Sequence, residues 1–371
     1  MNYFERNGQQ ILRLWVMLML LFFVAAGYVA GHRVYEDRIS SEMRQQERLD
    51  PSANEEGKTA VNSAVLNGVD ADNYKEVRVG IYVDRIVEIS TKATGWTVDF
   101  YIWFNWQGDG IHPGDYFQVI DGEIESKTQV KTSTTLVDGD THHYALYRVT
   151  ARITKFFNVV RYPLDNHLLT IRIEDMQHPW HALRYVPDVH GAEYSSRVVV
   201  PGYRLHDAQI ISKPHAYKTN RGDPMIAADT QAVFSQITYG VKIDRPDWGL
   251  YFKMIQGLFA SVAIALLAFI LGPAAGERIG LGVGAFFAAV GSSYVNLSEL
   301  PGVGMVTLID MTNGLTMVTI FLSIMGSVLS SRIAINESQL AIAERFDRIS
   351  LVIFMVGFTA VNIVMALLAS A

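Results

Sequence analysis

Five apolar segments constrain the fold of this chain more strongly than any motif in it. They cover residues 11–31, 248–271, 279–297, 306–330 and 349–370 of the 371-residue sequence. Each approaches the roughly 20 residues that an α-helix needs to cross a hydrocarbon core of about 30 Å. Hydrophobic residues make up 50% of the sequence, which is high for a soluble protein, and most of the excess lies in these segments. The sequence therefore predicts a multi-pass membrane protein.

Basic residues around these segments predict the orientation of the chain. Arg6 and Arg13 lie at the beginning of the first segment, and Arg332, Arg345 and Arg348 lie between the fourth and the fifth. Positive charge beside membrane helices concentrates on the cytoplasmic side. We therefore expect a cytoplasmic N-terminus in the plasma (inner) membrane and a periplasmic or extracellular domain at 32–247.

The first apolar segment has two interpretations. The small residues at 29–31 suit a signal peptidase, and a basic stretch precedes the segment. The alternative is a retained anchor, because the run 14–31 is long for a signal peptide and a charged, helix-favouring stretch follows it. Residues 1–49 are therefore expected to form an anchor helix with its extension, or a signal sequence. Pro, Gly, Asn and Asp interrupt residues 50–74, which predicts a neck or linker.

Residues 75–246 carry the alternating pattern of half-buried strands. Apolar side chains recur at every second position in several runs, which turn residues separate, and this pattern favours an antiparallel β-sandwich. The clearest runs are Val77, Val79, Ile81 and Val83, and Trp96, Val98, Phe100, Ile102, Phe104 and Trp106. Residues 247–371 hold the four C-terminal apolar segments, and we expect these to form a transmembrane domain of four helices.

Several functional classes receive no support from the sequence. A net charge of −6 without a basic stripe argues against nucleic acid as a partner. The phosphate-binding, nucleophile-elbow and zinc-protease motifs are absent, so we predict neither an enzyme nor a cofactor. The chain has no cysteine and hence no disulfide. His178 with His181 forms a weak candidate for a metal or proton site, and the acidic residues Asp121, Glu123 and Glu125 form a weak candidate for Ca²⁺.

One stretch, FFNVVRYPLDNHLLTIRIED at residues 156–175, lies upstream of the four C-terminal apolar segments. Its Tyr162-Pro163-x-Asp165 sequence and the alternating strand after it resemble the signature loop of the pentameric ligand-gated ion channels, the Cys-loop receptor superfamily. Two cysteines flank this loop in animal receptors and are missing here, so a prokaryotic member is the nearest comparison. The order of strands, loop, three closely spaced segments, polar loop and last segment also follows that family, over roughly residues 75–371.

The resemblance implies an external immunoglobulin-like sandwich joined to an all-α four-helix transmembrane bundle, here preceded by an extra N-terminal membrane helix. It implies a homopentamer in the lipid bilayer that conducts permeant ions. It also assigns roles to residues of this sequence. Coupling to the pore falls to Tyr162, Pro163, Asp165, Arg245 and Pro301, and binding of an unknown small molecule or a proton falls to the region of Trp180, Tyr217 and Phe234.

The segment 279–297 predicts a pore helix from its residues. Steps of three and four place mostly small residues and two aromatics on one face, namely Gly280, Gly284, Phe287, Gly291 and Tyr294. In a five-fold bundle Phe287 would form a hydrophobic constriction, and Glu277 would form an acidic ring that favours cations. Two alternatives remain open: the glycine spacing suits close helix packing, and Glu277 with Arg278 suits an ion pair at a helix start. Members of the resembled family usually carry Ser or Thr where this chain has glycine.

The sequence thus predicts a pentameric ligand-gated ion channel, cation-selective and gated by an external ligand. The alternative is a non-conducting, membrane-anchored sensor or binding scaffold with the same fold, in which the glycine face serves helix packing.

Overall fold

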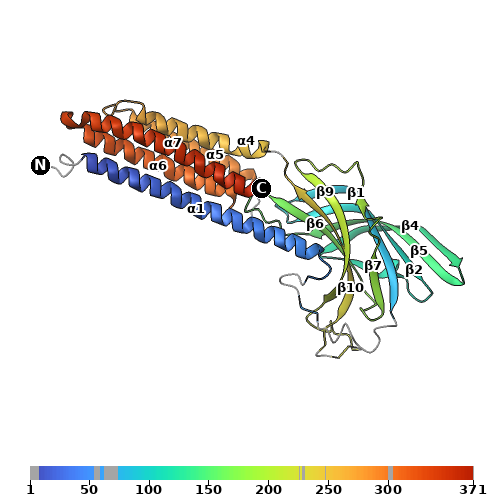
Figure 1. Cartoon of the computed structure of the whole chain (residues 1–371). Coiled ribbons are helices and arrows are strands. Elements are labelled where there is room, and N and C mark those ends of the chain that lie inside the picture. Colours follow the sequence, from blue (N-terminus) through green and yellow to red (C-terminus); the bar gives the residue numbers. More distant parts are fainter. Residues whose placement is uncertain are drawn as a thin grey trace. The chain divides into compact units, whose positions relative to one another are not determined.

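The computed structural model describes residues 8–53, 59–61, 74–224, 226–227, 230–246, 248–299 and 304–370. The chain divides into two compact units (Figure 1). The helical unit comprises Met1–Ser40, Asn158–Asp165 and Asp247–Ala371, and the strand unit comprises Ser41–Phe157 and Asn166–Pro246. The first half of the chain is therefore rich in β-sheet, and the C-terminal region is helical.

The strand unit contains two sheets. The larger follows the order β4-β5-β2-β1-β7, with β8 paired to β1, and the smaller follows β3-β6-β10-β9. The elements of this unit are β1 (Lys75–Ser90), β2 (Gly95–Gln107), the short helix α3 (Pro113–Tyr116), β3 (Phe117–Ile120), β4 (Gly122–Val137), β5 (Asp140–Thr154), β6 (Asn166–Asp175), β7 (Leu183–Pro187), β8 (Glu193–Tyr194), β9 (Arg204–Ala216) and β10 (Val233–Asp244).

The alternation in two runs of the sequence correctly predicts the buried side chains of β1 and β2. Every second side chain of β2 from Trp96 to Trp106 is buried, and Val77, Val79, Ile81 and Val83 of β1 are buried with them. The two sheets share this core, because Phe104 of β2 lies 5.4 Å from Phe117 of β3 between ring centroids. Apolar burial of this kind is the main stabilising contribution to a chain with no disulfide.

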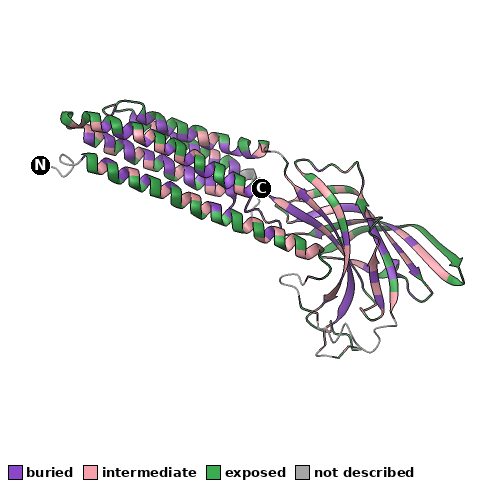
Figure 2. Cartoon of the chain, viewed as in Figure 1, coloured by how far each residue is buried: buried purple, intermediate pink, exposed green. Residues whose placement is uncertain are grey.

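Strand β4 differs from the others because nearly all of it is exposed. Figure 2 shows the exposed colour along this strand. Among its residues only Ile124 is half-buried. The strand lies at the end of the larger sheet and pairs with β5. A long exposed edge strand is a template for pairing or for contact with another chain.

The helical unit contains α1 (Gly8–Leu49) up to Ser40, α4 (Gly249–Leu266), α5 (Arg278–Glu299), α6 (Leu308–Ala334) and α7 (Leu340–Ser370). Short 3₁₀ turns at Leu267–Phe269 and Glu337–Gln339 follow α4 and precede α7. Among the described residues, five helices are long and apolar enough to span a membrane, as the sequence predicts. Side chains of residues 297–299 are outside this description, and most of the expected neck at 50–74 lies outside the described residues.

Helix α1 packs along α7 through small residues. A Cβ at Gly27 would lie 3.3 Å from Val361, and Phe23 covers Gly357. At the other end of this contact, the Trp15 indole donates a hydrogen bond of 3.1 Å to Ser350. The helix continues without interruption past the possible cleavage site at 29–31 as far as Leu49.

Candidate functional site

The five small and aromatic residues predicted to face a pore lie together on the exposed side of α5. We call this set the open face of α5: Gly280, Gly284, Phe287, Gly291 and Tyr294. Phe287 is 69% exposed and Tyr294 is 77% exposed. A Cβ placed on any of the three glycines would meet open space. The open face therefore does not pack against the other described helices of its own chain.

The opposite side of α5 carries the helix packing. Gly282, Ala285 and Ala289 are buried, and a Cβ at Gly282 would overlap the Ile324 side chain of α6. Close approach of helices at small residues is a general feature of membrane bundles. The packing role that the sequence suggested for Gly280 and Gly284 thus belongs, within this chain, to Gly282.

The same change, glycine to alanine, is expected to have opposite effects on stability on the two sides of α5. Gly282→Ala is expected to destabilise the helical unit by about 1–3 kcal/mol because the methyl group overpacks against Ile324. Gly284→Ala is the matched control and is expected to be neutral or stabilising, since alanine favours a helix over glycine. Thermal unfolding of both variants in detergent measures the difference. Equal melting temperatures would contradict the assigned packing side.

Arg278, at the start of α5, has a different partner from the one the sequence suggested. Its guanidinium is 1% exposed and donates a hydrogen bond of 2.8 Å to the Asp347 carboxylate of α7. A further contact of 3.4 Å reaches the Ser330 hydroxyl of α6. Glu277 is exposed. The expected Glu277–Arg278 pair is therefore replaced by a buried pair between α5 and α7, which leaves the Glu277 side chain on the surface.

The loop at residues 158–165, here named the Pro163 loop, belongs to the helical unit although it connects two strands. Arg161 is buried and contacts the Asp37 carboxylate of α1 at 3.3 Å and the Ala369 carbonyl of α7 at 3.2 Å. Asn158 also donates to Asp37, at 2.6 Å. The Val160 carbonyl accepts a hydrogen bond of 2.7 Å from the Leu308 amide at the start of α6. The Pro163 loop therefore makes polar contacts with α1, α6 and α7.

The residues predicted to couple the domains fall in both units. Tyr162, Pro163 and Asp165 are buried in the Pro163 loop. Arg245 lies in the strand unit, where it contacts the Tyr203 hydroxyl at 2.6 Å and the Tyr203 ring at 4.3 Å from the ring centroid. Pro301 lies outside the described residues. The contacts of Arg161 and Val160 carried no signal in the sequence, because their partners are distant in the chain.

The three aromatics of the expected ligand site gather in the strand unit. Tyr217 and Phe234 lie perpendicular to each other at 5.8 Å, and the Trp180 amide donates to the carbonyl of Val233, the neighbour of Phe234. Arginines already lie over these rings. The Arg221 guanidinium is 4.5 Å from the Tyr217 centroid, and the Arg184 guanidinium is 4.8 Å from that of Trp180. The protein's own arginines therefore occupy the cation–π positions over Tyr217 and Trp180.

A buried acid lies behind these aromatics and was missed by the sequence analysis. Glu174 is fully buried and accepts hydrogen bonds from the Tyr217 hydroxyl at 2.8 Å and from the Gln236 amide at 2.6 Å. The His215 ring also contacts it. Burial and the nearby Glu174 raise the pKa of Tyr217, which stays protonated and donates to the acid. A buried carboxylate needs such partners to offset its lost hydration.

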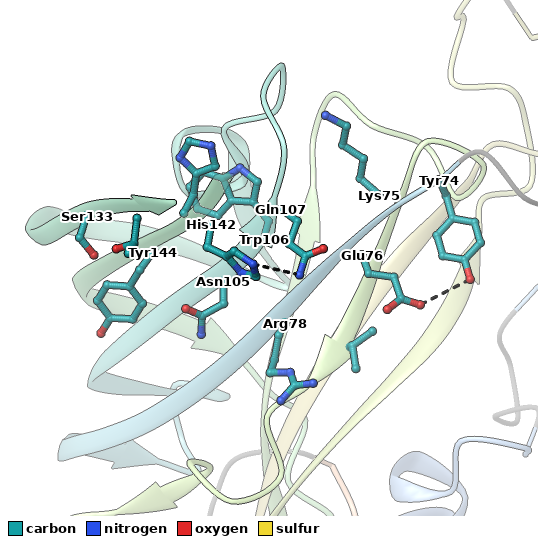
Figure 3. Close-up of a pocket in the computed structure, with 13 residues that line it drawn as sticks. Tyr74, Lys75, Glu76, Arg78, Asn105, Trp106, Gln107, Ser133, His142 and Tyr144 are labelled. Atoms are coloured by element: carbon teal, nitrogen blue, oxygen red, sulfur yellow. Dashed lines mark hydrogen bonds between the residues drawn. The ribbon is translucent and has the colours of Figure 1, made fainter. Parts of the chain in front are cut away.

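A separate cavity of about 770 Å³ opens on the larger sheet (Figure 3). Cross-strand pairing places Ser133, Tyr144, Asn105 and Arg78 in one row across it. Gln107 and His142 form a second row, with 3.4 Å between their side chains. The lining is polar and offers amide, imidazole and guanidinium groups to a small polar molecule. No residue of this cavity was singled out as a ligand contact from the sequence.

The weak metal candidates have protein partners. His178 contacts the Asp175 carboxylate at 2.9 Å, and Asp121 accepts a hydrogen bond of 2.9 Å from Arg172. Over the part of the chain that the structure describes, no group of three or more His, Asp or Glu side chains has an arrangement that could hold a metal ion.

Lys155 directly follows β5, and its side chain is half-buried. Burial lowers the pKa of its amine to about 7, with further contributions from the neighbouring cations Arg48 and Arg172. Its side chain still reaches the Phe157 ring, 5.4 Å from the centroid. Lys155 therefore holds its proton less firmly than a fully exposed lysine does.

Comparison with known proteins adds no family assignment to this geometry. No model of a known protein family matches the chain, and a search of curated proteins finds no match.

Proposed function

We propose that this protein is a homopentameric ion channel of the pentameric ligand-gated type in the plasma (inner) membrane. In this proposal the strand unit is an external immunoglobulin-like sandwich that binds the ligand. Helices α4 to α7 form the four-helix transmembrane bundle of each subunit, α5 lines the pore, and α1 is an additional membrane helix.

The open face of α5 is the observation that carries the proposal. Glycines with open space above them and two largely exposed rings occupy one side of an apolar helix, while its other side is packed. In five-fold symmetry that side supplies a water path of low polarity, with Phe287 as a hydrophobic constriction. Glu277 is exposed just before the helix and supplies an acidic ring, which favours cations.

Features of the strand unit are consistent with the proposed assembly and ligand binding. The exposed strand β4 offers an edge and a face to a neighbouring copy. The aromatic residues Trp180, Tyr217 and Phe234 would hold a cationic ligand that displaces Arg184 and Arg221 from their rings. Lys155 offers a titrating group if the ligand is a proton. The Pro163 loop, bonded to α1, α6 and α7, supports transmission of a change from strands to helices.

Current through a planar bilayer tests this proposal. Purified protein is expected to give discrete single-channel openings that carry K⁺ or Na⁺ in preference to Cl⁻. The fraction of time that the channel is open is then measured at different pH values and in the presence of candidate amines. An assembled protein that stays electrically silent in all conditions, also when it carries Phe287→Ser, would favour the non-conducting sensor or scaffold.

A further inference from the structure

An apolar groove of about 350 Å³ lies within the helical unit between α1, α6 and α7. Its walls include Phe22, Ala26 and Val29 of α1, Met311 and Val318 of α6, and Met365 of α7. All three helices are long and apolar enough to span a membrane. In a bilayer, a groove with such walls is filled by hydrocarbon rather than by water.

The length of the groove matches one leaflet. From Phe22 to Arg33 the groove follows about three turns of α1, which is roughly 16 Å along the helix axis. Half of a typical hydrocarbon core is about 15 Å. Phe22 would therefore lie near the bilayer centre, and Arg33, the first Arg or Lys after the apolar segment, would lie at the level of the headgroups.

Among the described residues that line the groove, Arg33 is the only cationic one. Its side chain is exposed, and within the described ranges no hydrogen bond or ion pair is found for it. Two nearby acids on α1 have other partners, since Glu36 pairs with His32 at 3.4 Å and Asp37 pairs with the buried Arg161. An exposed guanidinium above an apolar groove is complementary to a phosphate that carries an acyl chain.

We propose that this groove binds an anionic phospholipid of the outer leaflet, with one acyl chain along α1 and the phosphate at Arg33. The site requires that α1, α6 and α7 span a bilayer, as in the proposed function, but it does not require that the protein conducts ions. Gly314 of α6 lines the groove, and a Cβ there would meet open space, so a larger side chain can fill the groove without displacing a neighbour.

Native mass spectrometry of the full chain tests the site. The protein is released from micelles that contain either phosphatidylglycerol or phosphatidylcholine, and the retained lipids are counted. The wild type is expected to retain phosphatidylglycerol preferentially. Arg33→Gln is expected to lower that preference about tenfold, the effect of one charge-assisted contact. Arg13→Gln, which removes an exposed arginine at the other end of α1, is the matched control and should keep the preference.

Gly314→Leu tests the contribution of the apolar groove to lipid binding independently of the charge of Arg33. It is expected to reduce retention of both lipids while leaving the oligomeric mass unchanged. Equal retention of the two lipids by the wild type, or an unchanged preference in Arg33→Gln, would overturn the proposal. If Gly314→Leu instead dissociates the oligomer, a second copy of the chain occupies the groove, which also overturns it. If the protein retains phosphatidylglycerol but conducts no ions, the proposed channel function is contradicted and the proposed lipid site is supported.

Discussion

Replacing Phe287 by serine is expected to raise the current through the unstimulated protein by at least about tenfold. Phe287 is 69% exposed on the open face of α5. In a five-fold ring it would form a hydrophobic constriction that excludes water. Transfer of one such side chain between water and an apolar environment changes the free energy by about 1.5–3 kcal/mol. A change of 1.4 kcal/mol in the free energy of wetting the constriction alters the ratio of wetted to dry pores about tenfold. Current in a planar bilayer at zero ligand measures the effect.

Phe286→Ser is the matched control for this experiment. Phe286 is the same residue type at the same depth, and it is 37% exposed on the flank of the helix. A helix turns by about 100° per residue, so both rings cannot point at one axis. The control is therefore expected to leave the resting current unchanged. Equal currents from the two variants, or a larger current from Phe286→Ser, would place the water path on another side of α5.

The largest loss of stability is expected from Asp347→Ala. The Asp347 carboxylate is the ionic partner of the Arg278 guanidinium, and both side chains are buried, at 4% and 1% exposure. Removing one member of a buried pair leaves an uncompensated charge, which costs about 3–5 kcal/mol. The variant is expected to melt at a clearly lower temperature in detergent, because α5 and α7 lose their polar contact and Arg278 remains without a counter-ion.

The double variant Arg278→Met with Asp347→Leu distinguishes a lost charge pair from lost volume. Apolar residues of similar size can replace a buried ion pair with little cost, so the double variant is expected to recover most of the stability. Ser330→Ala removes only the contact of 3.4 Å to Arg278 and should have a small effect. If the double variant is as unstable as Asp347→Ala, the unpaired charge of Arg278 is not the cause of the lost stability.

Features that depend on local periodicity could be predicted from the sequence. The alternation from Trp96 to Trp106 predicts the buried side of β2, because successive strand residues point to opposite faces. The steps from Gly280 to Tyr294 predict one side of α5, and that side is exposed as a unit. The role of this side in conduction remains a prediction, since a single chain does not include its neighbours.

Features that depend on distant partners could not be predicted. Glu174 is flanked by strand residues in the sequence, and only the pairing of β6, β10 and β9 brings it to Tyr217 and His215. Arg161 lies in a loop whose partners Asp37 and Ala369 are more than a hundred residues away in opposite directions. The capping box between Thr307 and Asp310 at the start of α6 is different, because its two residues are three positions apart and the pattern is visible in the sequence.

Single-particle imaging of the purified protein in nanodiscs tests the central claim most directly. The account predicts class averages with five-fold symmetry in which α5 is the innermost helix and the open face of Gly280, Gly284, Phe287, Gly291 and Tyr294 surrounds the central axis. A ring in which another helix lines the axis, or a particle in which this face meets lipid, would contradict it.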